Sequence, residues 1–202
     1  DTGGEKPSTY TYLQNVAVPF AAQSGLTITV LGPEWRDSHN ALDLEAYCLK
    51  YHMLPGTFMR WCTDRYKLRS LRRYHHQVLG ATPDTPVEVW IGISTDEARR
   101  ATPSRWPDEV RRFPLIELCM SRQDAAATII RAGLPVPPKS GCFYCPLQTR
   151  ASWRALKRRS PDLFARALAM EANAYPKSDG SPRYLPAFGP LEQIAAQDDL
   201  PG

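Results

Sequence analysis

Two cysteines separated by two residues, Cys142 and Cys145, place the strongest constraint on the fold of this 202-residue chain. A glycine precedes the pair and a proline follows it, so the segment can form a tight knuckle whose two thiolates reach one metal. A tetrahedral metal site or an iron–sulfur cluster needs more than two ligands. Further thiolates are available upstream in the sequence. We therefore predict a metal site formed by Cys48, Cys62, Cys142 and Cys145.

Other interpretations of the five cysteines stay open at this point. The C-x-x-C pair could be a redox-active dithiol or two unreactive side chains. Cys48 could equally be a core residue, because it falls in a predicted helix. Cys119 stands in an apolar run, and we expect it in the core. The odd number of cysteines argues against a disulfide framework.

Composition narrows the class of protein. Apolar residues make up 43% of the chain and charged residues 23%, which is typical of a globular protein, and the net charge of +4 is mild. No apolar run is long enough to span a membrane, and the first twenty residues do not read as a secretory signal. We therefore expect a cytoplasmic protein with reduced thiols and no membrane partner.

The order of the predicted elements favours an α/β fold. We predict helices over residues 7–20, 41–51, 64–78, 124–132 and 152–173, the last interrupted near Pro161, and strands over residues 26–31 and 87–93. Strands that alternate with helices indicate a parallel sheet flanked by helices. A proline-rich link near residue 135 suggests an α/β domain over 1–135, followed by the knuckle, a basic helix and a loop-rich tail over 136–202.

Two basic segments and one loop are candidate binding sites. The basic residues around Cys62 suit a polyanionic ligand such as phosphate or sulfate. The segment Arg150–Arg159 could contact nucleic acid. The loop 94–97 follows a predicted strand, where open α/β sheets bind ligands. Each has a plainer explanation, which is a solvated helix face for the basic segments and a helix N-cap for the loop.

Five segments, in this order, resemble the phosphoadenosine phosphosulfate (PAPS) reductase family. Residues 1–10 resemble its D-T-G…P-E-T-Y segment, and residues 60–73 are similar to its C-C-x-x-R-K-V-x-P-L-x-R segment. Residues 90–99 are similar to its W-I-x-G-I-R-x-x-E-S strand and loop, and residues 113–118 to its N-P-L-x-D-W segment. The spacing of Cys62, Cys142 and Cys145 resembles the C-C…C-x-x-C cluster signature of adenylylsulfate reductases.

This resemblance implies an adenine nucleotide α-hydrolase-like fold, with a Rossmann-like parallel sheet and a PP-loop. It implies binding of an adenine nucleotide (PAPS, adenylylsulfate or ATP) and of a cysteine-ligated [4Fe–4S] cluster, with zinc as the alternative metal. The reaction would be sulfonucleotide reduction or adenylation-linked sulfur transfer, with a thiol reductant or a sulfur donor as partner. The matched segments and the loop assign to the nucleotide Asp1, Thr2, Gly3, Arg65, Lys67, Arg69, Arg72, Arg73, Gly92, Ser94, Asp96 and Glu97.

The chain departs from the family in three places. The S-G-G-x-D-S motif of the PP-loop does not occur, so we expect an incomplete phosphate cradle at the front of the fold. Trp61 replaces the first cysteine of the C-C pair, which leaves Cys48 as the candidate fourth ligand. No cysteine follows Cys145, where the reductases carry a nucleophile. A nucleic-acid-binding module with a structural zinc therefore stands as the alternative hypothesis.

Overall fold

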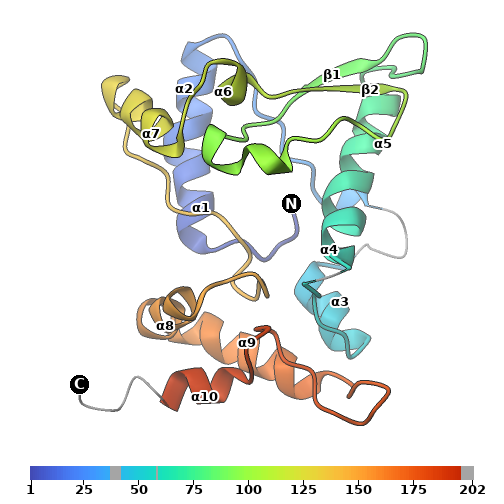
Figure 1. Cartoon of the computed structure of the whole chain (residues 1–202), viewed down its shortest axis with the longest axis vertical. Coiled ribbons are helices and arrows are strands. Elements are labelled where there is room, and N and C mark those ends of the chain that lie inside the picture. The colour runs from blue at the N-terminus through green and yellow to red at the C-terminus, as the bar shows by residue number, and fades with distance from the viewer. Residues whose placement is uncertain (37–41, 58, 197–202) are drawn as a thin grey trace. The chain divides into compact units, whose positions relative to one another are not determined.

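The computed structural model describes residues 1–36, 42–57 and 59–196, and it divides the chain into two compact units (Figure 1). Unit 1 comprises Asp1–Tyr10, Thr29–Ser70 and Lys139–Gly202, and unit 2 comprises Thr11–Ile28 and Leu71–Pro138. The boundary after Pro138 lies close to the one expected at residue 135. The residues expected to form the first domain, however, are shared between the two units.

Unit 1 is built from helices that surround a hydrophobic core. Helix α9 packs against α8, α10 and α3, and Figure 1 shows these segments together. The largest fully buried side chains are Trp153, Tyr66, Tyr144 and Phe143. The elements are α3 (Leu44–Lys50), α8 (Arg150–Arg159), α9 (Pro161–Asn173), α10 (Leu191–Ala196), the short helix α4 (Trp61–Thr63), the π-helical turn η4 (Asp64–Leu68) and the 3-10 turn η2 (Pro33–Trp35).

One half-buried carboxylate connects segments of the C-terminal part of unit 1. Glu171 of α9 accepts hydrogen bonds from the backbone N–H groups of Leu185, at 2.8 Å, and Leu191, at 2.9 Å. Leu191 is the first residue of α10, so the carboxylate caps that helix. Burial raises the pKa of Glu171, and the two backbone hydrogen bonds oppose that rise.

Unit 2 contains the sheet. Strands β1 (Val87–Trp90) and β2 (Glu109–Arg112) pair in parallel, with Val87 opposite Glu109 and Trp90 opposite Arg112 (Figure 1). The chain is therefore helix-rich with a small parallel sheet, which agrees with the α/β class at its coarsest. The other elements of this unit are η1 (Leu13–Ala17), α2 (Val18–Gln23), η5 (Thr95–Arg100), α6 (Pro114–Glu117) and α7 (Arg122–Arg131), while α1 (Pro7–Tyr12) and α5 (Arg69–Gln77) begin in unit 1.

Most of the predicted helices are confirmed. Residues 7–23 are helical through α1, η1 and α2, and residues 64–77 through η4 and α5. The predicted helix over 152–173 is interrupted as expected: α8 ends at Arg159, and α9 begins at Pro161 because proline is favoured in the first turn of a helix. Ser121 caps α7 in a reciprocal capping box with Asp124. Helix α3 covers most of the predicted 41–51, of which residue 41 lies outside the described residues.

The strand predictions are less accurate. Residues 26–31 do not form a strand, and Leu26, Ile28 and Val30 are exposed. The predicted strand over 87–93 ends at Trp90, which is 68% exposed, so this strand is not buried on both faces. Strand β2 is not expected from the sequence, because three of its four residues are charged and such residues are uncommon in strands.

The two units differ in what they bury. Of the buried apolar side chains in the described chain, only Ala81 and Ile93 lie in unit 2, whereas unit 1 holds a continuous core. No described helix has the length and apolar character needed to traverse a lipid bilayer.

Candidate metal centre

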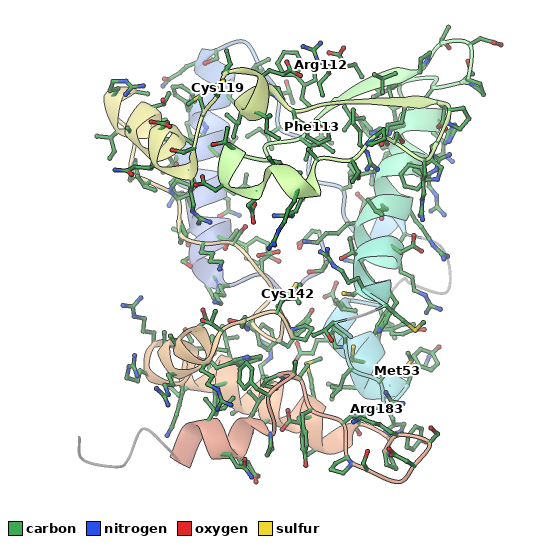
Figure 2. The ribbon with its side chains drawn as sticks, viewed as in Figure 1. Met53, Arg112, Phe113, Cys119, Cys142 and Arg183 are labelled. Atoms are coloured by element: carbon green, nitrogen blue, oxygen red, sulfur yellow. The ribbon has the colours of Figure 1, made fainter. Side chains whose placement is uncertain are left out.

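The four predicted ligands all lie in unit 1. Cys48 is in α3, Cys62 is in α4, and Cys142 and Cys145 are in the loop that precedes α8, where Figure 2 labels Cys142. Cys48 is 1% exposed and belongs to the hydrophobic core, and Cys62 and Cys142 pack against that core from its edge. The fold thus brings two helical cysteines and the C-x-x-C knuckle into one unit.

The four thiols lie near enough to affect one another's ionisation. Burial raises the pKa of Cys48 to about 12, and the neighbouring Cys62 and Cys142 add to that rise. Burial also raises the pKa of Cys62 and of Cys142, and Cys145 contributes to both shifts. Each thiol therefore interacts with two others, and together they form a closed set of four. Desolvation keeps the buried members of this set in the neutral thiol form at neutral pH.

The knuckle has the compact geometry expected from its sequence. The backbone N–H of Cys145 donates to the carbonyl of Cys142 at 3.0 Å, which closes a turn. Gly141 takes a φ of 150°, a conformation that suits glycine. The two residues between the cysteines, Phe143 and Tyr144, are fully buried, and their rings meet edge to face. These two rings anchor the knuckle in the core.

The first six residues of the chain hold the knuckle from its other side. Glu5 and Cys142 form an antiparallel bridge, and the N–H of Phe143 donates to the carbonyl of Gly4 at 2.9 Å. The N–H of Gly141 donates to a carboxylate oxygen of Glu5 at 2.6 Å. Backbone contacts and the Glu5 carboxylate therefore connect the knuckle to a segment far away in the sequence.

Thr2 links the knuckle to the helix that carries Cys48. Its hydroxyl lies 3.2 Å from the sulfur of Cys142, and its carbonyl accepts from the N–H of Leu44 at 3.1 Å, at the start of α3. The side chain is buried, and the hydroxyl contact lowers the pKa of Cys142 against the effect of burial. The resemblance assigns Thr2 to a nucleotide, and sequence reasoning misses this contact with sulfur.

Two further polar atoms of the core face the same region. The hydroxyls of Tyr66 and Tyr144 are buried and have no hydrogen-bond partner of normal geometry in the described chain. Burial raises the pKa of both, and the neighbouring Cys48 adds to each shift. Cys142 also raises the pKa of Tyr144, whereas the Thr2 hydroxyl lowers it. In the sequence, the position of Tyr144 inside the C-x-x-C motif is the one signal that could link either tyrosine to the site.

The chemistry of these groups suits a thiolate-bound metal, but their spacing in the structure does not. Buried thiols and unpartnered buried hydroxyls are the groups that a metal–thiolate centre would use. Within the described residues, however, no group of three or more His, Cys, Asp or Glu side chains is gathered closely enough to hold an ion. The sulfurs would therefore have to draw together when a metal binds, as happens where binding is coupled to folding.

Cys119 is not a core residue, contrary to expectation. It follows α6 in unit 2, is exposed, and adopts a left-handed φ of 54° (Figure 2). Its N–H donates to the carbonyl of Ile116, and the N–H of Met120 donates to that of Leu115, so Cys119 terminates the helix. The apolar run that precedes it forms the short helix α6, and Cys119 lies at the exposed end of that helix.

The residues assigned to a nucleotide are shared equally between the units. Unit 1 holds Asp1, Thr2, Gly3, Arg65, Lys67 and Arg69, and unit 2 holds Arg72, Arg73, Gly92, Ser94, Asp96 and Glu97.

Most of the basic side chains in this set already have partners. Arg65 donates to the hydroxyl of Tyr47 at 2.5 Å, and Arg69 pairs with Asp64 at 2.9 Å. Lys67 is half exposed, and its Nζ lies 3.8 Å from Glu5. The ion pairs of Arg69 and Lys67 reduce the charge available to an anionic ligand. The Tyr47 hydroxyl, by contrast, only orients Arg65.

Arg72, in unit 2, is held more firmly than the others. Its guanidinium lies 3.2 Å from the buried carboxylate of Asp108 and stacks on the ring of Trp106, 4.4 Å from the centroid. His76 contacts the second oxygen of Asp108 at 3.1 Å. This cluster of side chains joins α5 to the segment that leads into β2.

The loop after β1 makes local contacts within unit 2. Asp96 accepts from the hydroxyl of Ser94 at 3.3 Å and from the N–H of Arg122 at 2.5 Å, at the start of α7. Glu97 pairs with Arg100 at 2.6 Å. The loop begins the 3-10 helix η5, with Ser94 at the N-cap position and both acidic residues in the first turn, but no side chain caps this helix.

Gly3 and Asp1 also have structural roles. Gly3 has a φ of 73°, and a Cβ there would lie 2.5 Å from the carboxyl carbon of Asp43. The side chain of Asp1 accepts from the N–H of Gly3 at 3.0 Å and from the hydroxyl of Tyr10 at 2.9 Å. Both residues thus shape the segment that supports the knuckle.

Comparison with known proteins found no matching family model, no matching curated protein and no matching solved structure.

Proposed function

We propose that unit 1 binds a metal centre through Cys48, Cys62, Cys142 and Cys145. The observation that carries this proposal is the closed set of four thiols, which come from α3, α4 and a loop some eighty residues further along the chain. Four cysteine thiolates suit either a [4Fe–4S] cluster or a tetrahedral zinc ion. The resemblance of the surrounding segments favours the cluster.

We further propose that the chain acts on an adenine nucleotide, in sulfonucleotide reduction or in adenylation-linked sulfur transfer. This part rests on the resemblance of the five segments. A bound cluster would supply electron transfer or sulfur binding to such a reaction. The residues of this chain position it: the knuckle and α3 hold the sulfurs, and Thr2 orients Cys142. Lys67, which lowers the pKa of Cys142, is a cationic side chain close to this centre.

A structural zinc in a nucleic-acid-binding module is the second candidate. Helix α8, which follows the knuckle directly, carries five basic residues and no acidic one. Its apolar residues Trp153 and Leu156 are buried, while Arg150, Arg158 and Arg159 are exposed. A basic helix face of this kind suits phosphate groups.

Metal analysis of the anaerobically purified protein separates the two candidates. We expect iron with acid-labile sulfide and a brown colour for the cluster, whereas one zinc per chain would favour the second candidate. Cys142→Ser and Cys145→Ser should abolish metal loading. The matched control is Cys119→Ser, which should leave the metal in place because Cys119 lies in unit 2. A wild-type chain that takes up neither zinc nor a reconstituted cluster would refute the metal site.

Nucleotide binding needs its own measurement. Calorimetry with ATP and PAPS should detect weaker binding in Lys67→Ala than in the wild-type chain, with a smaller dependence on salt. Arg100→Ala, at an exposed local ion pair in unit 2, is the matched control. Equal affinity in the two variants would show that Lys67 lies on a solvated helix face and does not contact the nucleotide.

A further inference from the structure

The core of unit 1 contains two tyrosine hydroxyls that the fold itself does not satisfy. Tyr66 is 1% exposed and Tyr144 is 0% exposed, and both hydroxyl oxygens are without a partner of normal geometry in the described chain. Nearly all buried polar groups in folded proteins are hydrogen-bonded, so an unpartnered one indicates a ligand, an ion or a water that it meets. The indole N–H of Trp153 in the same core is also without a partner in the described chain, but Cys48 contributes to the pKa of both tyrosines.

Both hydroxyls lie among the four cysteines. Tyr66, Tyr144 and Cys48 belong to the same cluster of buried residues, and Cys62 and Cys142 pack against it. A Cβ on Gly4 would lie 2.0 Å from the Tyr144 hydroxyl, and the N–H of Gly4 contacts the hydroxyl of Thr2 at 3.3 Å. The Thr2 hydroxyl in turn touches the sulfur of Cys142. The Tyr144 hydroxyl and that sulfur are thus connected through Gly4 and Thr2.

A metal–thiolate centre in this core would need such donors. Four thiolates around a zinc ion or a [4Fe–4S] cluster leave the centre with a net negative charge, and burying that charge is costly unless hydrogen bonds offset it. Cys142 already meets the hydroxyl of Thr2, and Cys62 meets the hydroxyl and N–H of Thr63. The hydroxyls of Tyr66 and Tyr144 are further donors in this core, and Cys48, the most deeply buried of the four thiols, contributes to the pKa of both.

We propose that Tyr66 and Tyr144 are positioning residues of the metal centre, which donate hydrogen bonds to its sulfurs once a metal is bound. Tyr66 donates to Cys48, and Tyr144 donates to Cys142 or Cys48. This inference rests on the proposed metal site. It adds two buried phenol donors to the four cysteine ligands of the proposed centre.

The experiment compares Tyr66→Phe, Tyr144→Phe and the double variant with the wild-type chain. Tyr51→Phe is the matched control, because the Tyr51 ring packs on Tyr47 nearby but is 44% exposed. Zinc affinity is measured by competition with a chelator. We expect each core variant to bind zinc about 10–100-fold more weakly, as is typical when a hydrogen bond to a metal ligand is lost. The control should bind as the wild type does.

Two further readouts distinguish a donor from a packing residue. In the metal-free chain each Phe variant should be as stable as the wild type or more stable, because it removes an unsatisfied buried hydroxyl. After reconstitution with iron and sulfide, the reduction potential should become more negative, because fewer hydrogen bonds stabilise the added electron.

The outcomes separate this inference from the proposal beneath it. If the wild-type chain binds zinc or a cluster and the Phe variants bind it equally well, the donor role is refuted and the metal site stands. If the variants lose stability without metal and keep their zinc affinity, the hydroxyls are structural and the inference fails. If the wild-type chain binds no metal at all, both proposals fail.

Discussion

The hydroxyl of Thr2 lies 3.2 Å from the sulfur of Cys142, although 140 positions separate the two residues. The carbonyl of the same threonine accepts from the first residue of α3, the helix that carries Cys48. One buried residue near the start of the chain therefore joins two of the candidate ligands. The segment 1–6 is a structural part of the site.

Thr2→Val should weaken metal binding by about 10-fold, because it keeps the shape of the side chain and removes its hydrogen bond to sulfur. Zinc affinity from chelator competition measures the change. Thr2→Ser retains the hydroxyl and should recover most of the affinity. Loss of affinity in the serine variant but not in the valine variant would show that Thr2 acts through its methyl group and its packing.

Gly4→Ala should lower the free energy of unfolding by about 1–3 kcal/mol, as is typical of overpacking in a core. The new Cβ would lie 2.0 Å from the hydroxyl of Tyr144, whose ring is fully buried and has no room to move. Gly56→Ala is the matched control, because no atom lies within 4 Å of the position that a Cβ on Gly56 would occupy. Chemical denaturation compares the two, and an equal effect would contradict the close approach at Gly4.

Asp108→Asn should destabilise unit 2 in a pH-dependent way. Loss of water contacts by itself raises the pKa of Asp108, but hydrogen bonds from its own backbone N–H and from Arg72 outweigh that effect, and the pKa lies below its ordinary value. A lowered pKa contributes stability at neutral pH that disappears as the pH falls through the folded-state value. The difference in unfolding free energy between wild type and variant should therefore shrink in acid.

The control for Asp108 is Glu117→Gln. Glu117 pairs with Arg112 at the surface, where ion pairs contribute little to stability. Denaturant midpoints measured between neutral pH and about pH 3 should show a larger change for Asp108→Asn. A difference that stays constant with pH would mean that the lost contacts of Asp108 are not electrostatic.

Cys119→Gly should raise the free energy of unfolding by about 1 kcal/mol, because a side chain in the left-handed region is strained and glycine is not. The φ of 54° at the end of α6 is the basis for this expectation. Cys119→Ala keeps a Cβ and should show no such gain. Denaturation of the three proteins with equal metal content checks the order, and a glycine variant less stable than alanine would contradict it.

Local signals in the sequence predicted local structure well. Pro161 marks the break between α8 and α9, and Ser121 with Asp124 marks the start of α7, because capping and helix termination depend on residues a few positions apart. The C-x-x-C spacing predicted the knuckle for the same reason. Cys48 lies in the same unit as the other three cysteines and within the hydrophobic core, so its role as a ligand stays a prediction.

The parts that depend on long-range partners were not predictable. The β-branched run 26–31 has strong strand character, yet a strand forms only where a neighbour pairs with it. Arg72 belongs to a basic segment typical of phosphate sites, but its carboxylate partner, Asp108, lies 36 residues away. Thr2 and Cys142 are further apart still. No pattern within a short window contains information about such contacts.

Unit 1 is assembled from three stretches of chain, and this has a consequence for how the protein is made. Synthesis of the 80 positions from Cys62 to Cys142 takes about 4–16 s at about 5–20 residues per second. Throughout that interval Thr2, Cys48 and Cys62 have been synthesised, but the knuckle that they contact has not. Until then the core cluster that contains Cys48, and against which Cys62 packs, lacks Phe143 and Tyr144. The four thiols that we propose as ligands can therefore come together only after Cys145 has been synthesised.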